Sequence, residues 1–142
     1  MAETADAQKN GGTPRPLLRG LRVLMLDDEP DTLDALCTVL TMAGATVECA
    51  SEPTAALSSV ETFDPHVLVC DLYMPGTDGW TFMERVRGRG LTVPAVALTA
   101  HPSAANRARA LSCGYVTCLG KPVHPEELVG VLRSVAEADL GQ

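Results

Sequence analysis

Short apolar runs alternate with longer amphipathic segments along most of this 142-residue chain. Runs rich in Val and Leu predict strands, at residues 22–26, 46–49, 67–70, 94–98 and 114–119. The segments between them carry apolar residues at helical spacing and predict helices, at about 31–43, 51–62, 79–87, 103–112 and 125–138. Strands that alternate with helices in this way indicate a parallel sheet covered by helices on both faces.

The third run, Val67–Cys70, is apolar at every position, which is typical of a strand buried on both faces. The second run, Thr46–Cys49, alternates in character and suits an edge of the sheet. The economical arrangement is an α/β, flavodoxin-like, doubly wound (βα)5 three-layer sandwich with a parallel sheet of order 2-1-3-4-5. We expect one domain at 21–138, a flexible N-terminal tail or linker at 1–20 and a C-terminal tail at 139–142.

Composition narrows the class of protein without identifying a partner. The formal net charge of −7 argues against a surface for nucleic acid or anionic membranes. No apolar run approaches a membrane span and the N-terminus lacks a signal-peptide pattern, so we expect a cytoplasmic protein. The cysteines form no CxxC pair, so we expect buried reduced thiols, with neither a metal knuckle nor a disulfide framework. They are Cys37, Cys49, Cys70, Cys113 and Cys118.

Acidic side chains follow two of the predicted strands. Asp27 and Asp28 come directly after the first strand, and Asp71 comes after the third. These strands are neighbours in the expected order, so we expect the three carboxylates to converge at one crevice. Oxygen ligands without His or Cys favour Mg²⁺ over Zn²⁺. The alternative is that Asp27, Asp28 and Glu29 only cap the following helix.

The fourth and fifth predicted strands end in groups that suit a phosphoryl anion. Thr99 offers a hydroxyl and Lys121 offers an ammonium at the same end of the sheet. A phosphoryl group on Asp71 has three charged oxygens, which a metal, Thr99 and Lys121 would neutralise together. Separately, Thr99 is more often a strand terminator and Lys121 a surface charge. Functional groups at four strand ends together indicate a phosphoryl-accepting site centred on Asp71.

With these residues in place, the chain resembles the receiver domains of bacterial two-component response regulators, the CheY-like family, over roughly residues 20–138. The motifs that carry the resemblance are Val23–Pro30, Asp71–Gly76 with Asp78-Gly79, Ala97–Ala100 and Gly120–Pro122. The resemblance implies that Asp71 is the phosphoacceptor and that Thr99 and Lys121 contact the phosphoryl group. It also implies a cis Lys121-Pro122 bond. The Mg²⁺ ligands that it implies are Asp27, Asp28, Asp71 and the backbone carbonyl of Tyr73, with Asp28 more direct than Asp27.

The chain departs from the family at a switch position. Members commonly carry Tyr or Phe three residues before the lysine, where this chain has Cys118. A thiol cannot sweep the volume of a ring, so signalling is expected to rest on movement of the loop Thr99–His101. Receivers of hybrid sensor kinases often lack the ring too, and Leu21–Leu24 and Lys121–Leu128 also resemble that subgroup.

Two positions near Asp71 are candidates for setting the lifetime of a phosphorylated state. Tyr73 stands two residues after Asp71, and His101 stands two residues after Thr99. The hypothesis is that the Tyr73 ring and the His101 imidazole obstruct in-line attack by water. The alternative is that both are solvated loop residues without a kinetic role.

The sequence therefore predicts a signalling switch, not an enzyme. A sensor histidine kinase or a phosphotransfer protein would donate the phosphoryl group, and the new charge would shift protein–protein interactions. Few residues follow the last predicted helix, so we expect output through a protein target of unknown identity, with no nucleic acid or membrane contacted directly. A homodimer is a further option.

Three alternatives stay open. A haloacid-dehalogenase-like, Mg²⁺-dependent phosphatase would carry its nucleophile in an Asp-x-Asp motif after the first strand, which Asp27-Asp28 does not match. A flavodoxin-like FMN binder would need a Ser-, Thr- or Gly-rich phosphate loop where the acidic Asp27–Glu29 stands. A pseudo-receiver that binds partners without phosphorylation is disfavoured by the intact set of acidic, hydroxyl and amine groups.

Overall fold

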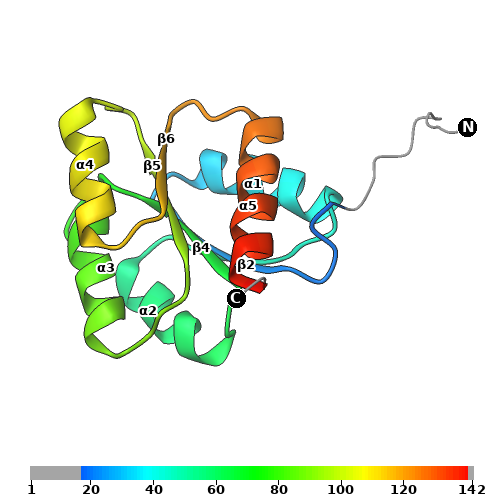
Figure 1. Cartoon of the computed structure of the whole chain (residues 1–142), viewed down its shortest axis with the longest axis horizontal. Coiled ribbons are helices and arrows are strands. Elements are labelled where there is room, and N and C mark those ends of the chain that lie inside the picture. The colour runs from blue at the N-terminus through cyan, green and yellow to red at the C-terminus, as the bar shows by residue number, and fades with distance from the viewer. Residues whose placement is uncertain (1–16, 141–142) are drawn as a thin grey trace, which may run out of the picture.

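The computed structural model of the protein describes residues 17–140, and its elements are labelled in Figure 1. The strands within these residues are β2 (Arg22–Leu26), β3 (Thr46–Ala50), β4 (Val67–Asp71), β5 (Ala95–Thr99) and β6 (Thr117–Gly120). The helices are α1 (Pro30–Met42), α2 (Pro53–Thr62), α3 (Gly79–Gly88), α4 (Ala104–Cys113) and α5 (Pro125–Leu140). The predicted alternation of strand and helix is confirmed in this part of the chain.

The strands form one sheet in the order β3-β2-β4-β5-β6, and every neighbouring pair is parallel. Counted along the chain, this is the predicted order 2-1-3-4-5. Helices α1 and α5 lie on one face of the sheet, while α2, α3 and α4 lie on the other (Figure 1). The flavodoxin-like three-layer sandwich is therefore confirmed.

The two faces of the sheet support two hydrophobic clusters. Successive residues of a strand point to opposite faces. Along β4, Val67 and Val69 pack in the cluster that includes α1 and α5, whereas Leu68 and Cys70 pack in the cluster that includes α2, α3 and α4. Every residue of β4 and β5 is buried, which explains why their apolar runs are continuous. Edge strand β3 keeps exposed positions, as its polar character predicts.

Strand β6 begins later than predicted. β6 starts at Thr117, whereas the apolar run suggested a start at residue 114. Gly114 ends α4 in the left-handed region at φ 116°, and the N–H of Tyr115 still bonds to the Ala110 carbonyl at 3.0 Å. Tyr115 therefore belongs to the turn before the strand. The α5 helix also runs to Leu140, beyond its predicted end at 138.

The N-terminal boundary of the core also differs from the prediction. Leu18 was placed in the tail at 1–20, but its side chain is 2% exposed and packs in the α1 and α5 cluster. Its N–H donates to the Ala43 carbonyl at 2.8 Å. Of the two predicted tails, at 1–20 and 139–142, residues 1–16 and 141–142 lie outside the described residues.

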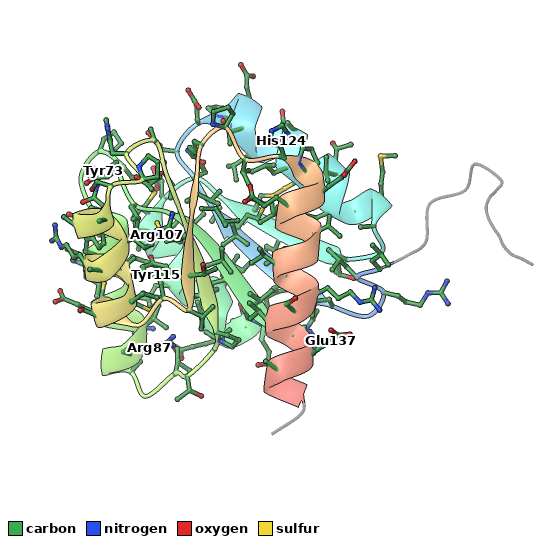
Figure 2. The ribbon with its side chains drawn as sticks, turned by 45° about the horizontal axis from the view of Figure 1, so that its top comes forward. Tyr73, Arg87, Arg107, Tyr115, His124 and Glu137 are labelled. Atoms are coloured by element: carbon green, nitrogen blue, oxygen red, sulfur yellow. A yellow bond between two sulfur atoms is a disulfide. The ribbon has the colours of Figure 1, made fainter. Side chains whose placement is uncertain are left out.

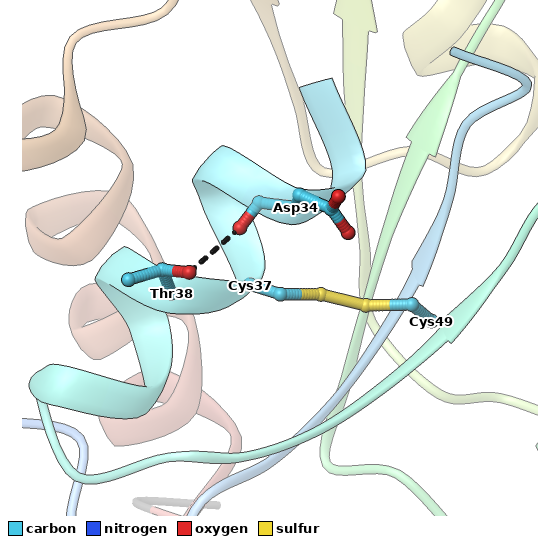
Figure 3. The surroundings of a disulfide bond; sticks show 4 residues. All are labelled: Asp34, Cys37, Thr38 and Cys49. Carbon is cyan, nitrogen blue, oxygen red and sulfur yellow. Dashed lines mark hydrogen bonds between the residues drawn. A yellow bond between two sulfur atoms is a disulfide. The ribbon is translucent and has the colours of Figure 1, made fainter. Parts of the chain in front are cut away.

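The prediction that all five cysteines are reduced is wrong at two positions. Cys37 on α1 and Cys49 on β3 form a disulfide, which Figure 3 shows crossing from the helix to the edge strand. The residues are 12 apart in sequence, a spacing that carries no recognised signal, and they meet only because α1 packs beside β3. The remaining cysteines are free, with Cys70 and Cys118 buried as expected and Cys113 half-buried.

No helix within residues 17–140 is both long enough and apolar enough to cross a bilayer.

Candidate functional site

The carboxyl ends of β2 and β4 bring three carboxylates together. These strands pair in a register that sets Leu26 opposite Cys70, so the residues that follow, Asp27 and Asp71, lie side by side. One oxygen from each of Asp27, Asp28 and Asp71 lies within 4.8 Å of the others. The acidic residues that the sequence analysis singled out thus converge at one crevice.

Asp27 and Asp28 are held in different ways. Asp27 is fully buried, and its Oδ1 accepts the Glu29 N–H at 2.9 Å. Its own N–H donates to the Ala50 carbonyl at 3.2 Å. Asp28 is exposed. Of the three acidic residues, Glu29 is the N-cap residue of α1, and its side chain makes no capping hydrogen bond.

Lys121 reaches the carboxylates from the end of β6. Its Nζ lies 2.8 Å from Asp27 Oδ2 and 3.2 Å from Asp71 Oδ2. Its backbone N–H donates to the Thr99 carbonyl at 2.7 Å, which ties the ends of β5 and β6 together. The expected cis Lys121-Pro122 bond is present.

The pKa values of Asp71 and Lys121 are both shifted by their surroundings. Burial raises the pKa of Asp71, and the charge of Asp27 raises it further, while the Lys121 ammonium and the Tyr73 N–H oppose the shift. Burial lowers the pKa of Lys121, but its hydrogen bond to Asp27 and the charge of Asp71 outweigh burial and raise it. Lys121 therefore stays charged, while an ionised Asp71 remains incompletely compensated.

Thr99 stands at the end of the strand beside Asp71. β5 pairs with β4 so that Leu98 is opposite Asp71, and Thr99 follows Leu98. Thr99 is fully buried, and its hydroxyl oxygen accepts the His101 N–H at 2.9 Å. Because this oxygen accepts that bond, the hydroxyl can still donate its own hydrogen to a second group.

An aromatic rim lies beside the acidic crevice. The Tyr73 ring is 44% exposed and meets the His101 ring edge-on, with the centroids 5.4 Å apart. It also meets the Trp80 ring edge-on at 6.2 Å. The Arg109 guanidinium lies 4.2 Å from the Trp80 ring centroid. The sequence analysis did not identify Arg109, because nothing in its local spacing indicates which ring it covers.

Cys118 lies on the strand that leads to Lys121. It is fully buried, and its backbone carbonyl accepts a hydrogen bond from Arg107 Nη1 at 2.7 Å. Arg107 thus joins α4 to β6 at the position where the family commonly has a ring. This contact was also missed, since Arg107 reads as a solvated charge on a polar helix.

The donor set at the crevice fits a hard divalent cation. All three side chains offer oxygen, which Mg²⁺ prefers. Asp28 is exposed, and the three carboxylates share the crevice with the ammonium of Lys121, which contacts Asp27 and Asp71. Asp27, Asp28 and Asp71 are accordingly the side chains that could hold such an ion.

Comparisons with known sequences agree with this geometry. The profile of the family described as the response regulator receiver domain matches residues 23–133. An uncharacterized 14.6 kDa protein of Leptolyngbya boryana is 41% identical over 118 residues, which cover 82% of this chain and 90% of that protein. The transcriptional regulatory protein TrcR of Mycobacterium tuberculosis is 35% identical over 115 residues, which cover 81% of this chain but 45% of TrcR. The chain spans about half the length of such regulators, with 50% for the transcriptional activator IrlR of Burkholderia pseudomallei.

Two solved structures illustrate that other proteins share this fold. The receiver domain of the Francisella response regulator 1452 superposes with a TM-score of 0.81 at 25% identity, covering 84% of this chain and 99% of that one. The chemotaxis protein CheY4 of Vibrio cholerae superposes with a TM-score of 0.77 at 28% identity, covering 81% and 98%. The further resemblance to receivers of hybrid sensor kinases stays a prediction.

Proposed function

Because this chain belongs to the family of response regulator receiver domains, the phosphoaccepting signalling modules of two-component systems, we propose that it accepts a phosphoryl group on Asp71. The donor is a sensor histidine kinase or a phosphotransfer protein. The observation that supports this most strongly is the crevice where Lys121 lies within 3.2 Å of Asp71 and 2.8 Å of Asp27, with Asp28 beside them. The chain in this proposal catalyses only its own phosphorylation and dephosphorylation.

The transfer is a displacement at phosphorus. An Asp71 carboxylate oxygen attacks the phosphorus of a phosphohistidine, so an O–P bond forms while the N–P bond breaks. The imidazole nitrogen leaves with the bonding electron pair and takes a proton from solvent. Asp71 suits the nucleophile because it is 5% exposed and sits at the end of a central strand, where a donor can approach it from one side.

The neighbouring groups neutralise the transferred charge. Lys121 already contacts Asp71 and would pair with a phosphoryl oxygen, while the Thr99 hydroxyl would donate to another. Asp27, Asp28, Asp71 and the Tyr73 backbone carbonyl would hold Mg²⁺. When bound, this ion neutralises negative charge on the transferring oxygens.

Phosphorylation would change the conformation of the loop after β5. The Thr99 hydroxyl accepts the His101 N–H at 2.9 Å, so a Thr99 side chain that turns toward a phosphoryl oxygen releases or displaces this loop. Cys118 cannot supply the ring movement common in the family. The proposed output is contact with a protein target, since the net charge of −7 does not favour nucleic acid.

The proposed donors imply a cytoplasmic location. Cysteines in that compartment are normally kept reduced. The Cys37–Cys49 pair would then form its disulfide only under oxidising conditions.

The decisive experiment is phosphorylation by a small-molecule donor. Wild-type protein incubated with acetyl phosphate and Mg²⁺ is expected to gain the mass of one phosphoryl group, in an acid-labile and hydroxylamine-labile linkage typical of an acyl phosphate. Asp71→Asn is expected to gain none. Intact-protein mass spectrometry gives the readout.

The matched control is Asp34→Asn, which alters an exposed aspartate on α1 by the same chemical change. This variant is expected to be phosphorylated like wild type. An unmodified wild type, or an Asp71→Asn variant that is modified as fully as wild type, contradicts the proposal. Omission of Mg²⁺ tests the metal requirement separately.

A further inference from the structure

The side chain of Tyr115, labelled in Figure 2, is buried where the chain passes from α4 to β6. It is 2% exposed although it lies in a turn. The left-handed Gly114 turns the chain inward at this point, and the Tyr115 N–H closes the end of α4. The phenol ring thus enters the core from a loop that leads to β6.

The Tyr115 hydroxyl contacts two residues that are distant in sequence from it and close to Asp71. It donates to the Gly79 carbonyl at 2.8 Å, across a sequence separation of 36 residues. It also shares a hydrogen bond with the thiol of Cys70. Burial raises the pKa of the Cys70 thiol and of the Tyr115 phenol.

Cys70 and Gly79 bracket the loop that carries Asp71 into α3. The Cys70 Sγ lies 3.4 Å from the backbone oxygen of Asp71. The Gly79 N–H donates to the Leu72 carbonyl at 3.0 Å, and a Cβ added to Gly79 would lie 2.7 Å from the Asp71 backbone oxygen. One hydroxyl therefore contacts residues at both ends of this loop.

The loop between these ends carries groups of the proposed site. The Tyr73 N–H donates to Asp71 Oδ1 at 3.3 Å, and the Tyr73 carbonyl is the proposed backbone ligand. A loop held at both ends presents that carbonyl and the Asp71 oxygens in one arrangement before an ion arrives. Such preorganisation lowers the cost of binding.

We propose that Tyr115 is a positioning residue for the phosphoacceptor site, which holds the loop at residues 72–78 through its hydroxyl and so sets the affinity for Mg²⁺. This rests on the proposed function of Asp71. Packing alone does not account for the hydroxyl, because a phenyl ring fills nearly the same volume without needing a polar partner.

The variant that isolates the hydroxyl is Tyr115→Phe. Half-saturation by Mg²⁺ is followed by the fluorescence of Trp80, the chain's one tryptophan, which lies next to Gly79. Loss of one net hydrogen bond that preorganises the loop is expected to raise the half-saturating Mg²⁺ concentration by about fivefold. Phosphorylation by acetyl phosphate is expected to need correspondingly more Mg²⁺ while its rate at saturating Mg²⁺ changes little.

The matched control is Val129→Ala, a buried truncation on α5 in the cluster on the other face of the sheet. It lowers stability without touching the loop and is expected to leave the Mg²⁺ dependence unchanged. If Tyr115→Phe also leaves that dependence unchanged while wild type responds to Mg²⁺, the positioning role is overturned.

A second measurement needs no metal. Amide hydrogen exchange in residues 72–79 of the metal-free protein is expected to be faster in Tyr115→Phe than in wild type or Val129→Ala. Unchanged exchange in Tyr115→Phe overturns the inference, whatever the protein's function. A wild type that shows this protection but neither binds Mg²⁺ nor accepts a phosphoryl group instead refutes the proposed function and, with it, the role in Mg²⁺ affinity.

Discussion

At the scale of single residues, Asp71 is a buried carboxylate whose nearest charged neighbours include a second carboxylate. The fold buries it next to Asp27 and offers Lys121 as a partner shared by both carboxylates. The net result is a pKa raised above its ordinary value of 3.8. The protonated form of Asp71 is therefore relatively favoured by folding, and its ionisation lowers the free energy of unfolding.

We expect Asp71→Asn to stabilise the metal-free protein. The raised pKa means that the stabilising contribution of protonated Asp71 is complete below pH 3.8 and is lost as pH rises through the folded-state pKa. An amide cannot ionise, so the variant should melt a few degrees higher at pH 7 in the presence of a chelator. Thermal unfolding measures this, with Asp34→Asn as the control.

The same two proteins can be compared by thermal unfolding in the presence of Mg²⁺. Mg²⁺ is expected to raise the melting temperature of wild type, because the ion relieves the repulsion between carboxylates. The difference in melting temperature between wild type and Asp71→Asn should therefore become smaller. A variant that melts lower than wild type in chelator would show that the contact between Lys121 and the Asp71 charge outweighs burial and repulsion.

The aromatic rim gives a kinetic prediction. The Tyr73 and His101 rings contact each other edge-on beside the crevice, and they are expected to hinder the in-line approach of water to a phosphorylated Asp71. Tyr73→Asn and His101→Ala are therefore expected to lose the phosphoryl group several-fold faster than wild type. The decay of the phosphorylated mass after removal of the donor measures this, and rates equal to wild type would remove the hypothesis.

At the scale of elements, the connection from β4 to α3 is held by a helix cap and by a close approach of two backbones. Asp78 caps α3 by accepting the Thr81 N–H at 2.8 Å. Gly79 begins the helix directly against the backbone of β4's end, with space for no side chain. The sequence Asp78-Gly79 thus combines a helix cap with a close approach of two backbones.

Gly79→Ala is expected to be destabilising and to impair phosphorylation. The new Cβ would lie 2.7 Å from the Asp71 oxygen and 2.8 Å from the Leu72 Cα, and backbone atoms cannot move aside cheaply. We expect a loss of about 1–3 kcal/mol in the free energy of unfolding, measured by urea denaturation. Gly88→Ala, in the same helix with open space around it, is expected to be neutral or stabilising by up to about 1 kcal/mol.

The α1–β3 pair depends on the redox state of Cys37 and Cys49. A disulfide that closes a loop of this length stabilises a domain by about 3 kcal/mol in the chain-entropy description. We expect reductant or Cys37→Ser to lower the free energy of unfolding by up to that amount, and reductant to have no further effect on Cys37→Ser.

Thiol titration of the unfolded protein tests the pairing itself. The oxidised chain is expected to show the three free thiols of Cys70, Cys113 and Cys118, and the reduced chain all five cysteines. Cys113→Ser is the control, since it removes a free thiol and should leave the response to reductant intact. Five reactive thiols after mild oxidation would contradict the pairing.

At the scale of the whole molecule, the sheet separates two hydrophobic clusters, and different segments cover each of them. The cluster under α2, α3 and α4 reaches the Asp71 loop through Tyr115 and Cys70. The cluster under α1 and α5 is closed in part by the N-terminal turn, where Leu18 packs and bonds to Ala43. The turn before β2 is therefore part of the domain.

We expect Leu18→Ala to lower the free energy of unfolding by about 2–4 kcal/mol, because it opens a cavity at a side chain that is 2% exposed. Leu17→Ala changes a neighbouring side chain that is 40% exposed and is expected to cost less than about 0.5 kcal/mol. Chemical denaturation of both variants separates a core role from a surface one. If both variants lose the same free energy of unfolding, Leu18 is not part of the core.

The sequence by itself determined the strand order and the members of the acidic crevice. Val67–Cys70 is apolar throughout because both faces of β4 are covered, and Thr46–Cys49 is partly polar because β3 is an edge. Parallel strands end at one edge of a sheet, so Asp27, Asp71 and Thr99 could be placed together once the order was known. These are periodic or terminal features, and a linear sequence records them directly.

The tertiary structure alone decided which distant side chains meet. Three contacts join segments that are separate in sequence: the Cys37–Cys49 disulfide, the packing of Leu18 in the core, and the hydrogen bond from Tyr115 to Gly79. The local sequence pattern of one segment does not indicate its partner. The same holds for Arg107 on Cys118 and Arg109 on Trp80. Such contacts depend on helix rotation and on the depth at which each side chain packs. Many residues set these quantities together, so no single motif encodes them.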